Sequence, residues 1–306
     1  MKHLTFIPTP VEKMDYYSSK YGCNLQVKRD DLFLVAGGGS KARMLQYILA
    51  NDDEYDVLIT AGGPNSNFNR ACVLMCAKLK KSMHLIEYAE DETQFTNSLN
   101  YKICLMSDIQ KTRCFKHEVV KTIQDVIDSY DDKGIKTKYI YGGGKGIEGV
   151  FSYYEAIKEV YSQSIEIDYL FVACGTGTTL TGISAGLQEY YPNAKVYAIS
   201  VARTWVNEKA VLEDNMNLLN DYLSTQYDFN NMIFSEDYLC GGYALKTKEL
   251  EDCIHECISN EGMLIDPVYS GKAFYGMTRI IAKNKKVFDG KNILFWNTGA
   301  IFNLFA

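Results

Sequence analysis

Short apolar segments alternate with longer amphipathic segments along most of this chain. Residues 56–60 and 168–173 have the apolar character of buried strands, and helical patterns follow them at 68–81 and 180–190. Strands that alternate with helices in this way form parallel βαβ units, so the pattern predicts an α/β fold. Further strands are predicted at 83–89, 107–115, 138–141 and 196–201, and further helices at 117–129, 149–161 and 248–260.

Composition narrows the class of protein. The 306 residues leave room for one large domain or two of ordinary size, and 47% hydrophobic with 23% charged residues is typical of a globular chain. The longest apolar run, 169–174, is far shorter than a membrane-spanning helix, and residues 1–8 lack the apolar stretch of a signal peptide. Because 38 acidic residues outnumber 32 basic ones, we expect no nucleic-acid partner. We therefore expect a cytoplasmic protein with no membrane partner.

The nine cysteines are an odd number scattered through the chain, which favours reduced thiols. Cys72 and Cys76, like Cys253 and Cys257, are four residues apart and would share one face of a helix. A structural zinc ion needs four converging ligands, and the sequence has no CxxC pair. We therefore predict no metal site and interpret the cysteines as packing residues.

In parallel sheets of this kind, ligands bind in the loops at the carboxyl ends of the strands. Those loops here follow residues 60, 141 and 173, and all contain glycines. The loop at 142–146 carries three glycines and Lys145, but Tyr139 stands where a Walker A motif requires glycine. We interpret this loop as a connection between domains.

Residues 174–179, CGTGTT, follow the clearest strand and begin a helix. At such a junction, backbone N–H groups and the positive end of the helix attract a phosphate. Two glycines allow close approach of the backbone, and three threonine hydroxyls can donate to phosphate oxygens. Leu180 occupies the place of the third glycine in GxGxxG, so the loop is not a dinucleotide fingerprint. On its own, the loop fits a phosphate site and a tight turn capped by threonine equally well.

A second glycine-rich segment, 37–39, precedes Ser40 and Lys41 at the start of an apolar helical stripe. The start of a helix favours anions, so its field would lower the pKa of Lys41 and favour the neutral, nucleophilic amine. Schiff-base chemistry requires an amine in that form. On spacing alone, a solvated lysine beside a flexible loop is the simpler interpretation.

The third segment, 62–67, again connects a strand to a helix. Ser66 and Asn67 are common residues at helix N-termini, and capping accounts for them without any ligand. At the mouth of a parallel sheet, the same hydroxyl and amide could also hold a ligand. GxSxG is absent and no base lies nearby in the sequence, so the segment does not indicate a serine hydrolase.

Taken together, these segments resemble motifs of the fold type II pyridoxal-phosphate (PLP) enzymes, specifically the family of D-cysteine desulfhydrase and 1-aminocyclopropane-1-carboxylate deaminase. The resemblance covers nearly the whole chain, with the motifs in the family's order. Residues 266–273, DPVYSGKA, are the most specific match. The others are KRDDL at 28–32, GGSKAR at 38–43, GPNSNFNR at 63–70 and TGTTLTG at 176–182.

The resemblance implies an α/β fold similar to that of the tryptophan synthase β subunit, with two parallel-sheet domains and the cofactor between them. Residues 1–45 and 150–306 would form the large PLP-binding domain, and 46–149 a smaller inserted α/β domain. The resemblance also implies a homodimer.

The resemblance assigns cofactor-binding roles to individual residues of this chain. Lys41 would form the Schiff base with PLP, Asn67 would bond the ring hydroxyl, and Thr298 would meet the pyridine nitrogen. The phosphate would be bound by the loop of Gly175, Thr176, Gly177, Thr178 and Thr179.

Four residues would carry out catalysis in this interpretation. Lys41 or a nearby hydroxyl would remove the α-proton, and Ser66 would hold the substrate carboxylate or assist proton transfer. Tyr269 would lie at the reacting centre and protonate the leaving group, and Tyr243 resembles a second family tyrosine. With 23 tyrosines in the chain, packing is the alternative for both tyrosines.

Two positions bear on the substrate. Ser270 resembles the small hydroxylic residue of the desulfhydrases, where the ring-opening deaminases look to carry glutamate. Thr298 resembles the threonine of the desulfhydrase HTGG motif, where the ring-opening branch looks to have leucine. A hydroxyl leaves the ring a weaker electron sink than a carboxylate does, which suits β-elimination of a thiolate. Substrate identity stays open because Ser40, Asn65 and Ala300 replace the family's asparagine, glutamine and glycine.

We therefore predict a PLP-dependent carbon–sulfur lyase or deaminase that acts on a small amino acid. The leading hypothesis is a D-cysteine desulfhydrase, which forms pyruvate, ammonia and hydrogen sulfide. The alternatives are 1-aminocyclopropane-1-carboxylate deaminase, another amino-acid lyase or β-replacement enzyme, and a catalytically idle relative that binds a ligand. Lys41 argues against the idle relative, because loss of that lysine is the simplest route to one.

Overall fold

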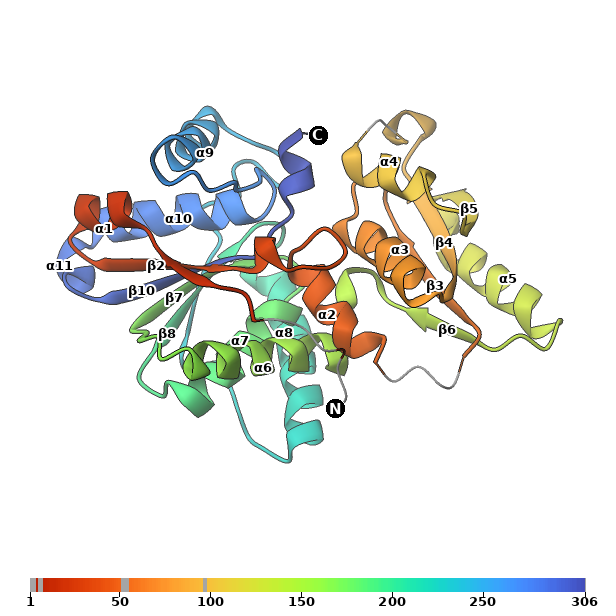
Figure 1. The fold of residues 1–306 in the computed structure, drawn as a ribbon, viewed down its shortest axis with the longest axis horizontal. Helices are drawn as coiled ribbons and strands as arrows, with labels where there is room; N and C mark the ends of the chain where they lie inside the picture. Colours follow the sequence, from red (N-terminus) through yellow and green to blue (C-terminus); the bar gives the residue numbers. More distant parts are fainter. Residues whose placement is uncertain (1–3, 5–7, 51–54, 96–97, 306) are drawn as a thin grey trace.

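The computed structural model describes residues 4, 8–50, 55–95 and 98–305, which form two separate β-sheets covered by helices (Figure 1). The α/β fold predicted from the alternating pattern is therefore confirmed. Most of the first seven residues, on which the signal-peptide argument rests, lie outside the described part of the chain.

The larger sheet has six strands in the order β1-β2-β10-β7-β8-β9. All neighbouring strands are parallel except β1 and β2. Because β2 pairs with β10 along its whole length, the two ends of the chain meet in one sheet. The strands are β1 (Val11–Lys13), β2 (Asn24–Arg29), β7 (Tyr169–Cys174), β8 (Lys195–Ser200), β9 (Met232–Ser235) and β10 (Asn292–Asn297).

Both faces of this sheet are buried, because side chains that point to opposite faces of its central strands are apolar. Phe171 and Phe295 belong to a core cluster with α10 on one face, and Leu170 and Leu294 belong to a cluster with α7 on the other. The helices of the first face are α1 (Asp15–Tyr21), α9 (Lys248–Glu261), α10 (Ser270–Lys283) and the short α11 (Lys285–Phe288), and those of the second are α6 (Ile147–Ser162), α7 (Thr178–Tyr190) and α8 (Trp205–Leu223) (Figure 1).

The smaller sheet has four parallel strands in the order β5-β4-β3-β6. On one face of its central strand, Leu58 shares a core cluster with Phe68 of α3. On the other face, Ile59 clusters with Val126 of α5. The elements are β3 (Val57–Gly62), β4 (Ser82–Ala89), β5 (Gln110–Phe115), β6 (Thr137–Ile140), α3 (Asn67–Leu79), α4 (Leu99–Leu105) and α5 (Val119–Asp131).

We refer to the six-stranded sheet with α1 and α6–α11 as the large lobe, and to the four-stranded sheet with α3–α5 as the small lobe. Helix α2 (Ser40–Ile48) lies between them and contacts α3 of one lobe and α6 of the other (Figure 1). Two 3-10 turns, η4 (Gly142–Gly144) and η5 (Ile301–Phe305), also contact the small lobe. Shorter 3-10 turns are η1 (Asp30–Leu32), η2 (Glu92–Gln94) and η3 (Lys116–Glu118).

The structure confirms the strands predicted at 56–60 and 168–173 and adds two central ones, β2 and β10, that the alternating pattern did not predict. The pattern did not predict β2 because Lys28 interrupts its apolar character. Lys28 is nevertheless fully buried, since its ammonium pairs with Glu159 and donates to the Thr9 carbonyl at 2.6 Å. Only the three-dimensional partner makes this position compatible with a core strand.

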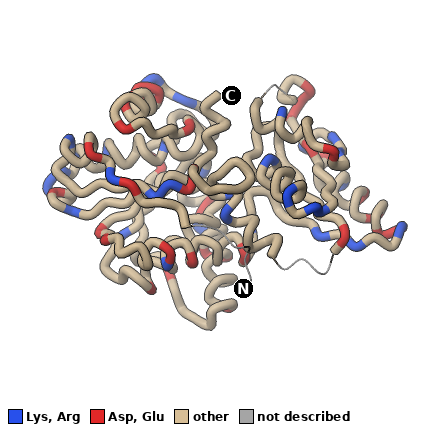
Figure 2. Tube along the Cα trace, viewed as in Figure 1, with Lys and Arg blue, Asp and Glu red and all other residues tan. Residues whose placement is uncertain are grey.

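Charged side chains of both signs are interspersed over the two lobes (Figure 2). No helix in the described ranges is long and apolar enough to cross a membrane. Seven of the nine free cysteines are buried, and Cys114 and Cys240 are partly exposed. Across residues 4, 8–50, 55–95 and 98–305, no three or more His, Cys, Asp or Glu side chains are grouped as metal ligands would be. The buried cysteines thus contribute to core packing.

Asp30, at the end of β2, connects several elements of the large lobe through its fully buried carboxylate. It accepts hydrogen bonds from the Arg43 guanidinium of α2 at 2.7 and 3.0 Å and from the Tyr153 hydroxyl of α6 at 3.0 Å. The Trp296 indole of β10 and the Thr9 hydroxyl each donate at 2.8 Å. Burial alone would raise the pKa of Asp30, but the Arg43 guanidinium holds it below its usual value.

Replacing Asp30 with alanine should lower the free energy of unfolding by about 3–5 kcal/mol, because it leaves buried donors without an acceptor. Chemical denaturation measures this loss. Glu12→Ala is the matched control, since it also removes a carboxylate partner of an arginine, Arg29, but at a site where the carboxylate is 44% exposed. The control should cost less than about 1 kcal/mol. Equal losses for the two variants would contradict the central role of Asp30.

Candidate active site

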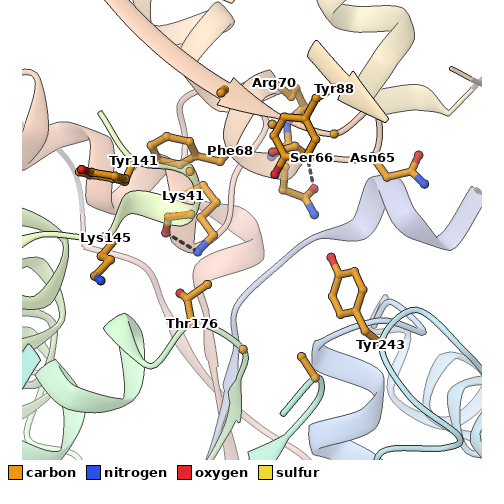
Figure 3. Close-up of a pocket in the computed structure, with 18 of the residues that line it drawn as sticks. Lys41, Asn65, Ser66, Phe68, Arg70, Tyr88, Tyr141, Lys145, Thr176 and Tyr243 are labelled. Atoms are coloured by element: carbon orange, nitrogen blue, oxygen red, sulfur yellow. Dashed lines mark hydrogen bonds between the residues drawn. The ribbon is translucent and has the colours of Figure 1, made fainter. Parts of the chain in front are cut away.

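A cavity of about 1440 Å³ lies between the two lobes, at the carboxyl ends of β3, β6, β7 and β10 (Figure 3). Open parallel sheets bind ligands at this edge. The volume exceeds the roughly 300–1,000 Å³ typical of a pocket for one small ligand, so a cofactor and a substrate both have room. The lining comes largely from the four glycine-containing segments, at 38–41, 61–68, 141–145 and 173–180.

The structure brings the predicted site residues together around the cavity, except for the side chain of Thr178. The side chain of Thr178 is fully buried beside Gly149 and does not line the cavity, so only its backbone is left to contact a phosphate. The predicted residues that line the cavity are Lys41, Ser66, Asn67, Gly175, Thr176, Gly177, Thr179, Tyr243, Tyr269 and Thr298.

Lys41 lies in the first turn of α2, as the helical stripe predicts. Its ammonium donates to the Gly143 carbonyl at 2.8 Å, and the thioether of Met44 lies 3.9 Å away (Figure 3). Burial lowers the pKa of Lys41 to about 8, because the charged form loses its hydration. About a tenth of the amine is then neutral at pH 7, compared with about one part in three thousand for an ordinary lysine.

The backbone before Lys41 needs its glycines. A side chain at Gly38, where φ is +74°, would bring Cβ to 2.3 Å from the Asp31 carbonyl. Gly39, at φ +88°, donates its N–H to the Asp30 carbonyl at 2.8 Å. The next N–H, that of Ser40, donates to the Thr298 carbonyl at 2.9 Å. The start of α2 is thereby tied to both β2 and the end of β10.

The loop at 175–179 has the geometry of an anion site. Gly177 has φ +74°, a backbone conformation that residues with a side chain rarely adopt, and a Cβ there would also lie 2.9 Å from Leu212. Within the described chain, the N–H groups of residues 178–180 at the start of α7 donate no hydrogen bond. Free N–H groups at a helix N-terminus bind phosphate. The Thr176 hydroxyl lies 3.4 Å from that of Thr178, at the edge of this group.

For Ser66 and Asn67 the sequence allowed two interpretations, helix capping and contact with a ligand, and the structure is compatible with both. The Ser66 hydroxyl caps α3 by accepting the Asn69 N–H at 3.1 Å, and its side chain also lines the cavity. The Asn67 carbonyl oxygen accepts from Arg70 at 2.8 Å and from Asn100 at 3.3 Å. Capping therefore does not exclude contact with a ligand.

Tyr269 is fixed by the carboxylate of Asp266. That carboxylate accepts the backbone N–H groups of Val268 and Tyr269, both at 3.0 Å, and of Ser270 at 2.7 Å. The hydroxyls of Tyr269 and Tyr243 lie 2.6 Å apart. Burial raises the pKa of Tyr269 well above its ordinary value, so the phenol is neutral near pH 7 and keeps its hydroxyl proton.

Ser270 and Thr298, the two positions that bear on the substrate, differ in their access to the cavity. Thr298 lines it. Ser270 is fully buried and does not line it, because its hydroxyl donates to Asp266 at 2.8 Å. The same hydroxyl lies 3.4 Å from the Gly299 carbonyl. Ser270 therefore acts on the site through Asp266 and through the segment that carries Thr298.

Sequence reasoning missed several residues of the site. The loop at 142–146 is more than a connection between domains, because Gly143 holds Lys41; its place after a strand was the available signal. Arg70 is part of a recognised motif but received no role, although its buried side chain lines the cavity. Tyr88 and Tyr141 flank the cavity as well (Figure 3). No motif pointed to these two tyrosines.

The groups in the cavity fit pyridoxal phosphate. The free N–H groups at the start of α7 suit its phosphate, and the amine of Lys41, with its lowered pKa, suits its aldehyde. The side chains of Asn67 and Thr298 offer hydrogen-bonding groups for the polar atoms of the ring.

A model of the family described as "Pyridoxal-phosphate dependent enzyme" matches residues 3–299. The chain therefore belongs to this family, and PLP is its cofactor. Its parallel-sheet lobes, with the cavity between them, have the fold type II architecture.

Within the family, the chain is 32% identical to the putative 1-aminocyclopropane-1-carboxylate deaminase of Thermotoga maritima, over 99% of this chain and 97% of the relative. The chain is 29% identical to the D-cysteine desulfhydrase of Serratia proteamaculans, over 97% of this chain and 93% of the relative. It is also 29% identical to the mitochondrial bifunctional D-cysteine desulfhydrase/1-aminocyclopropane-1-carboxylate deaminase of Arabidopsis thaliana, over 99% and 78%. The solved structure of an ACC deaminase homologue matches with a TM-score of 0.87 at 28% identity, over 98% and 92%. These similarities confirm the resemblance drawn from the motifs.

The rate at which the PLP-free protein takes up PLP should depend on pH in a way set by Lys41. Only the neutral amine attacks an aldehyde, so the rate should rise about tenfold per pH unit up to about pH 8 and then level off. The visible absorbance of PLP bonded to lysine, followed by rapid mixing, measures it. A rate that keeps rising through pH 10 would show an unperturbed lysine instead.

Two variants serve as controls for this titration. Lys41→Ala should give no visible band, and borohydride should not fix PLP to it. Lys145 lines the same cavity, and Lys145→Ala should keep both the band and the pH profile of the uptake rate.

Proposed function

We propose that the protein is a PLP-dependent lyase that eliminates hydrogen sulfide from D-cysteine, and that addition of water to the remaining product gives pyruvate and ammonia. The observation that carries this proposal is that Thr298, a residue with a hydroxyl and no carboxylate, lines the cavity directly after β10. By resemblance, this residue meets the nitrogen of the cofactor ring.

The charge of the cavity supports the same reaction. Of the described residues that line it, only Glu90 has a carboxylate, and Lys116 pairs with that group. No carboxylate is therefore free to hold a proton on the ring nitrogen, and the ring withdraws electrons less strongly than a protonated one. Such a site suits a substrate whose own leaving group takes up the electron pair, as the thiolate of cysteine does.

The residues of this chain then divide the work. PLP supplies the electron-withdrawing ring when it is bound. Lys41, freed when the substrate amine takes its place, removes the α-proton, because its pKa of about 8 makes the neutral amine accessible. Ser66, at the positive end of α3, holds the substrate carboxylate. Tyr269 donates a proton to the departing sulfur, and Tyr243 supports it through the 2.6 Å hydrogen bond.

The second candidate is 1-aminocyclopropane-1-carboxylate deamination. The similarity to the Thermotoga maritima relative, named as a putative 1-aminocyclopropane-1-carboxylate deaminase, and to the Arabidopsis protein, whose name gives both activities, is in its favour. The absence of a free carboxylate from the described lining weighs against it, because ring opening offers no thiolate to take up the charge.

We also propose domain boundaries and an assembly state. The strands of the smaller sheet all lie within 57–140, which supports a small domain at 46–149 inserted into a large one at 1–45 and 150–306. A homodimer and a cytoplasmic location rest on the resemblance and on the cysteine content.

The substrate is tested with the purified, PLP-loaded protein. D-Cysteine should yield sulfide and pyruvate in equal amounts, and L-cysteine and the cyclopropane amino acid serve as comparisons. Formation of 2-oxobutanoate from the cyclopropane amino acid without sulfide from D-cysteine would overturn the proposal in favour of the second candidate. Loss of sulfide release in Lys41→Ala confirms that the reaction belongs to this site.

Replacement of Tyr269 by phenylalanine should lower kcat for sulfide release by about a hundredfold, since the donor for the leaving group is lost. Tyr243→Phe removes only the supporting hydroxyl and should cost about tenfold or less. Both variants should keep the visible band of bound PLP. Equal kcat values for the Tyr269 variant and the wild type would leave this tyrosine with a packing role.

A further inference from the structure

Arg70 is a buried cation that forms no ion pair with any acidic residue in the described ranges. Its side chain is only 1% exposed, although it lines the cavity. Its guanidinium donates to the side-chain oxygens of Asn67 at 2.8 Å and Asn100 at 2.9 Å, and to the Gly38 carbonyl at 3.3 Å. Its Nε is buried with no hydrogen-bond partner among the described residues. Neutral oxygens alone therefore receive the hydrogen bonds of this charge.

The ring of Phe302, in η5, covers the guanidinium, with 4.3 Å between the guanidinium carbon and the ring centroid. An aromatic face stabilises a cation without neutralising it. Asn303, in the same turn, accepts from Asn100 at 3.1 Å and donates to Asp266 at 3.4 Å. The turn of the large lobe thus holds Arg70 and its neighbour Asn100, both on the small lobe.

These contacts fix the orientation of the Asn67 amide. A guanidinium can only donate, so the atom of Asn67 that faces Arg70 must be the carbonyl oxygen. That oxygen also accepts from the amide nitrogen of Asn100. The amide nitrogen of Asn67 donates to no group in the described chain. It is left free to donate to a ligand in the cavity.

The acceptor that this nitrogen meets follows from the chemistry of PLP. The cofactor has two anionic acceptors, its phosphate and its ring oxygen. The phosphate is accounted for by the free N–H groups at the start of α7, on the large lobe. The ring oxygen is the partner that the resemblance assigns to Asn67, and the free amide nitrogen fits that assignment.

We propose that Arg70 is a positioning residue for the cofactor: it turns the Asn67 amide nitrogen toward the ring oxygen of PLP and places positive charge behind that hydrogen bond. This role rests on the cofactor and not on the identity of the substrate. A guanidinium behind the amide polarises it and makes its N–H a stronger donor to an anionic oxygen. A carboxylate partner would cancel this effect, which accounts for the neutral surroundings of Arg70.

A binding comparison between PLP and 3-deoxypyridoxal 5′-phosphate, which lacks the ring oxygen, tests this role. The dissociation constant of the 3-deoxy compound divided by that of PLP measures what the ring oxygen contributes to binding. In Arg70→Met this ratio should fall by roughly tenfold or more, because the hydrogen bond of Asn67 loses both its orientation and its charge assistance. The missing oxygen can also affect the bond between the cofactor and Lys41. This effect is the same in the wild type and the variants, so it cancels when their ratios are compared. Arg70→Lys, which keeps the charge, should restore part of the ratio.

Asn67→Ala supplies the decisive comparison. If Arg70 acts through Asn67, the ratio in Asn67→Ala falls as far as in Arg70→Met, and the double variant shows no further fall. Arg113→Met is the matched control, because Arg113 also lies over aromatic rings of the small lobe but does not line the cavity. Its ratio should equal that of the wild type.

The outcomes separate positioning from a purely structural role. Weaker binding of both cofactors by the same factor in Arg70→Met, with the ratio unchanged, would overturn the proposal. An additional fall in the double variant beyond Asn67→Ala would also overturn it, since Arg70 would then act by another route. If Arg70→Met does not fold, the ratio in Phe302→Leu decides: a fall, smaller than in Asn67→Ala, supports the proposal, and a wild-type ratio contradicts it. None of these results depends on sulfide release, so the proposed function stands or fails separately.

Discussion

The buried carboxylate of Asp30 sets the position of the reactive lysine. Through Arg43 it holds α2, the helix that begins with Ser40 and Lys41, and through Trp296 it holds β10. Its own backbone carbonyl accepts the N–H of Gly39, directly before that helix. Burying the carboxylate costs free energy, and the cost is offset because hydrogen-bond donors surround both of its oxygens. The same carboxylate thus connects β10, near the end of the chain, to the segment after β2, and it positions α2 so that Lys41 lines the cavity.

Much of the site consists of backbone rather than side chains. The carbonyl of Gly143 accepts from Lys41, and the first N–H groups of α7 are left free. Groups of this kind depend on glycines at positive φ, such as Gly38 and Gly177, where a side chain would collide with neighbouring atoms. Ala300, at φ +68°, shows the cost of a side chain at such a position, because alanine there occupies a conformation that glycine adopts more easily.

Sequence patterns predicted the βαβ architecture and the residues of the glycine-rich loops because both depend on local order along the chain. Local pattern alone left Lys41 and Ser66 open between a ligand role and a solvated lysine or a helix cap. The resemblance to the family assigned them their roles, and both line the cavity. The patterns did not predict β2, since Lys28 is acceptable in a core strand only beside Glu159, more than a hundred residues away. They compared Ser270 with the family by residue type alone, and could not show that its hydroxyl is bonded to Asp266 and does not line the cavity. Arg70 received no role, because its function depends on contacts with three separate segments.

The distribution of charge around the cofactor links Arg70 to the choice of reaction. Positive charge lies behind Asn67, on the side assigned to the ring oxygen, and a hydroxyl rather than a carboxylate lies at Thr298, on the side assigned to the ring nitrogen. Both features favour a ring with an anionic oxygen and an unprotonated nitrogen. A ring in that state accepts less negative charge from the substrate, so the substrate must place the charge elsewhere. A thiolate does this as it leaves, with Tyr269 as its proton donor, whereas the strained carbon ring of the cyclopropane amino acid has no comparable group. The electrostatics of the cavity therefore favour elimination of sulfur over ring opening before any contact to the substrate side chain is considered.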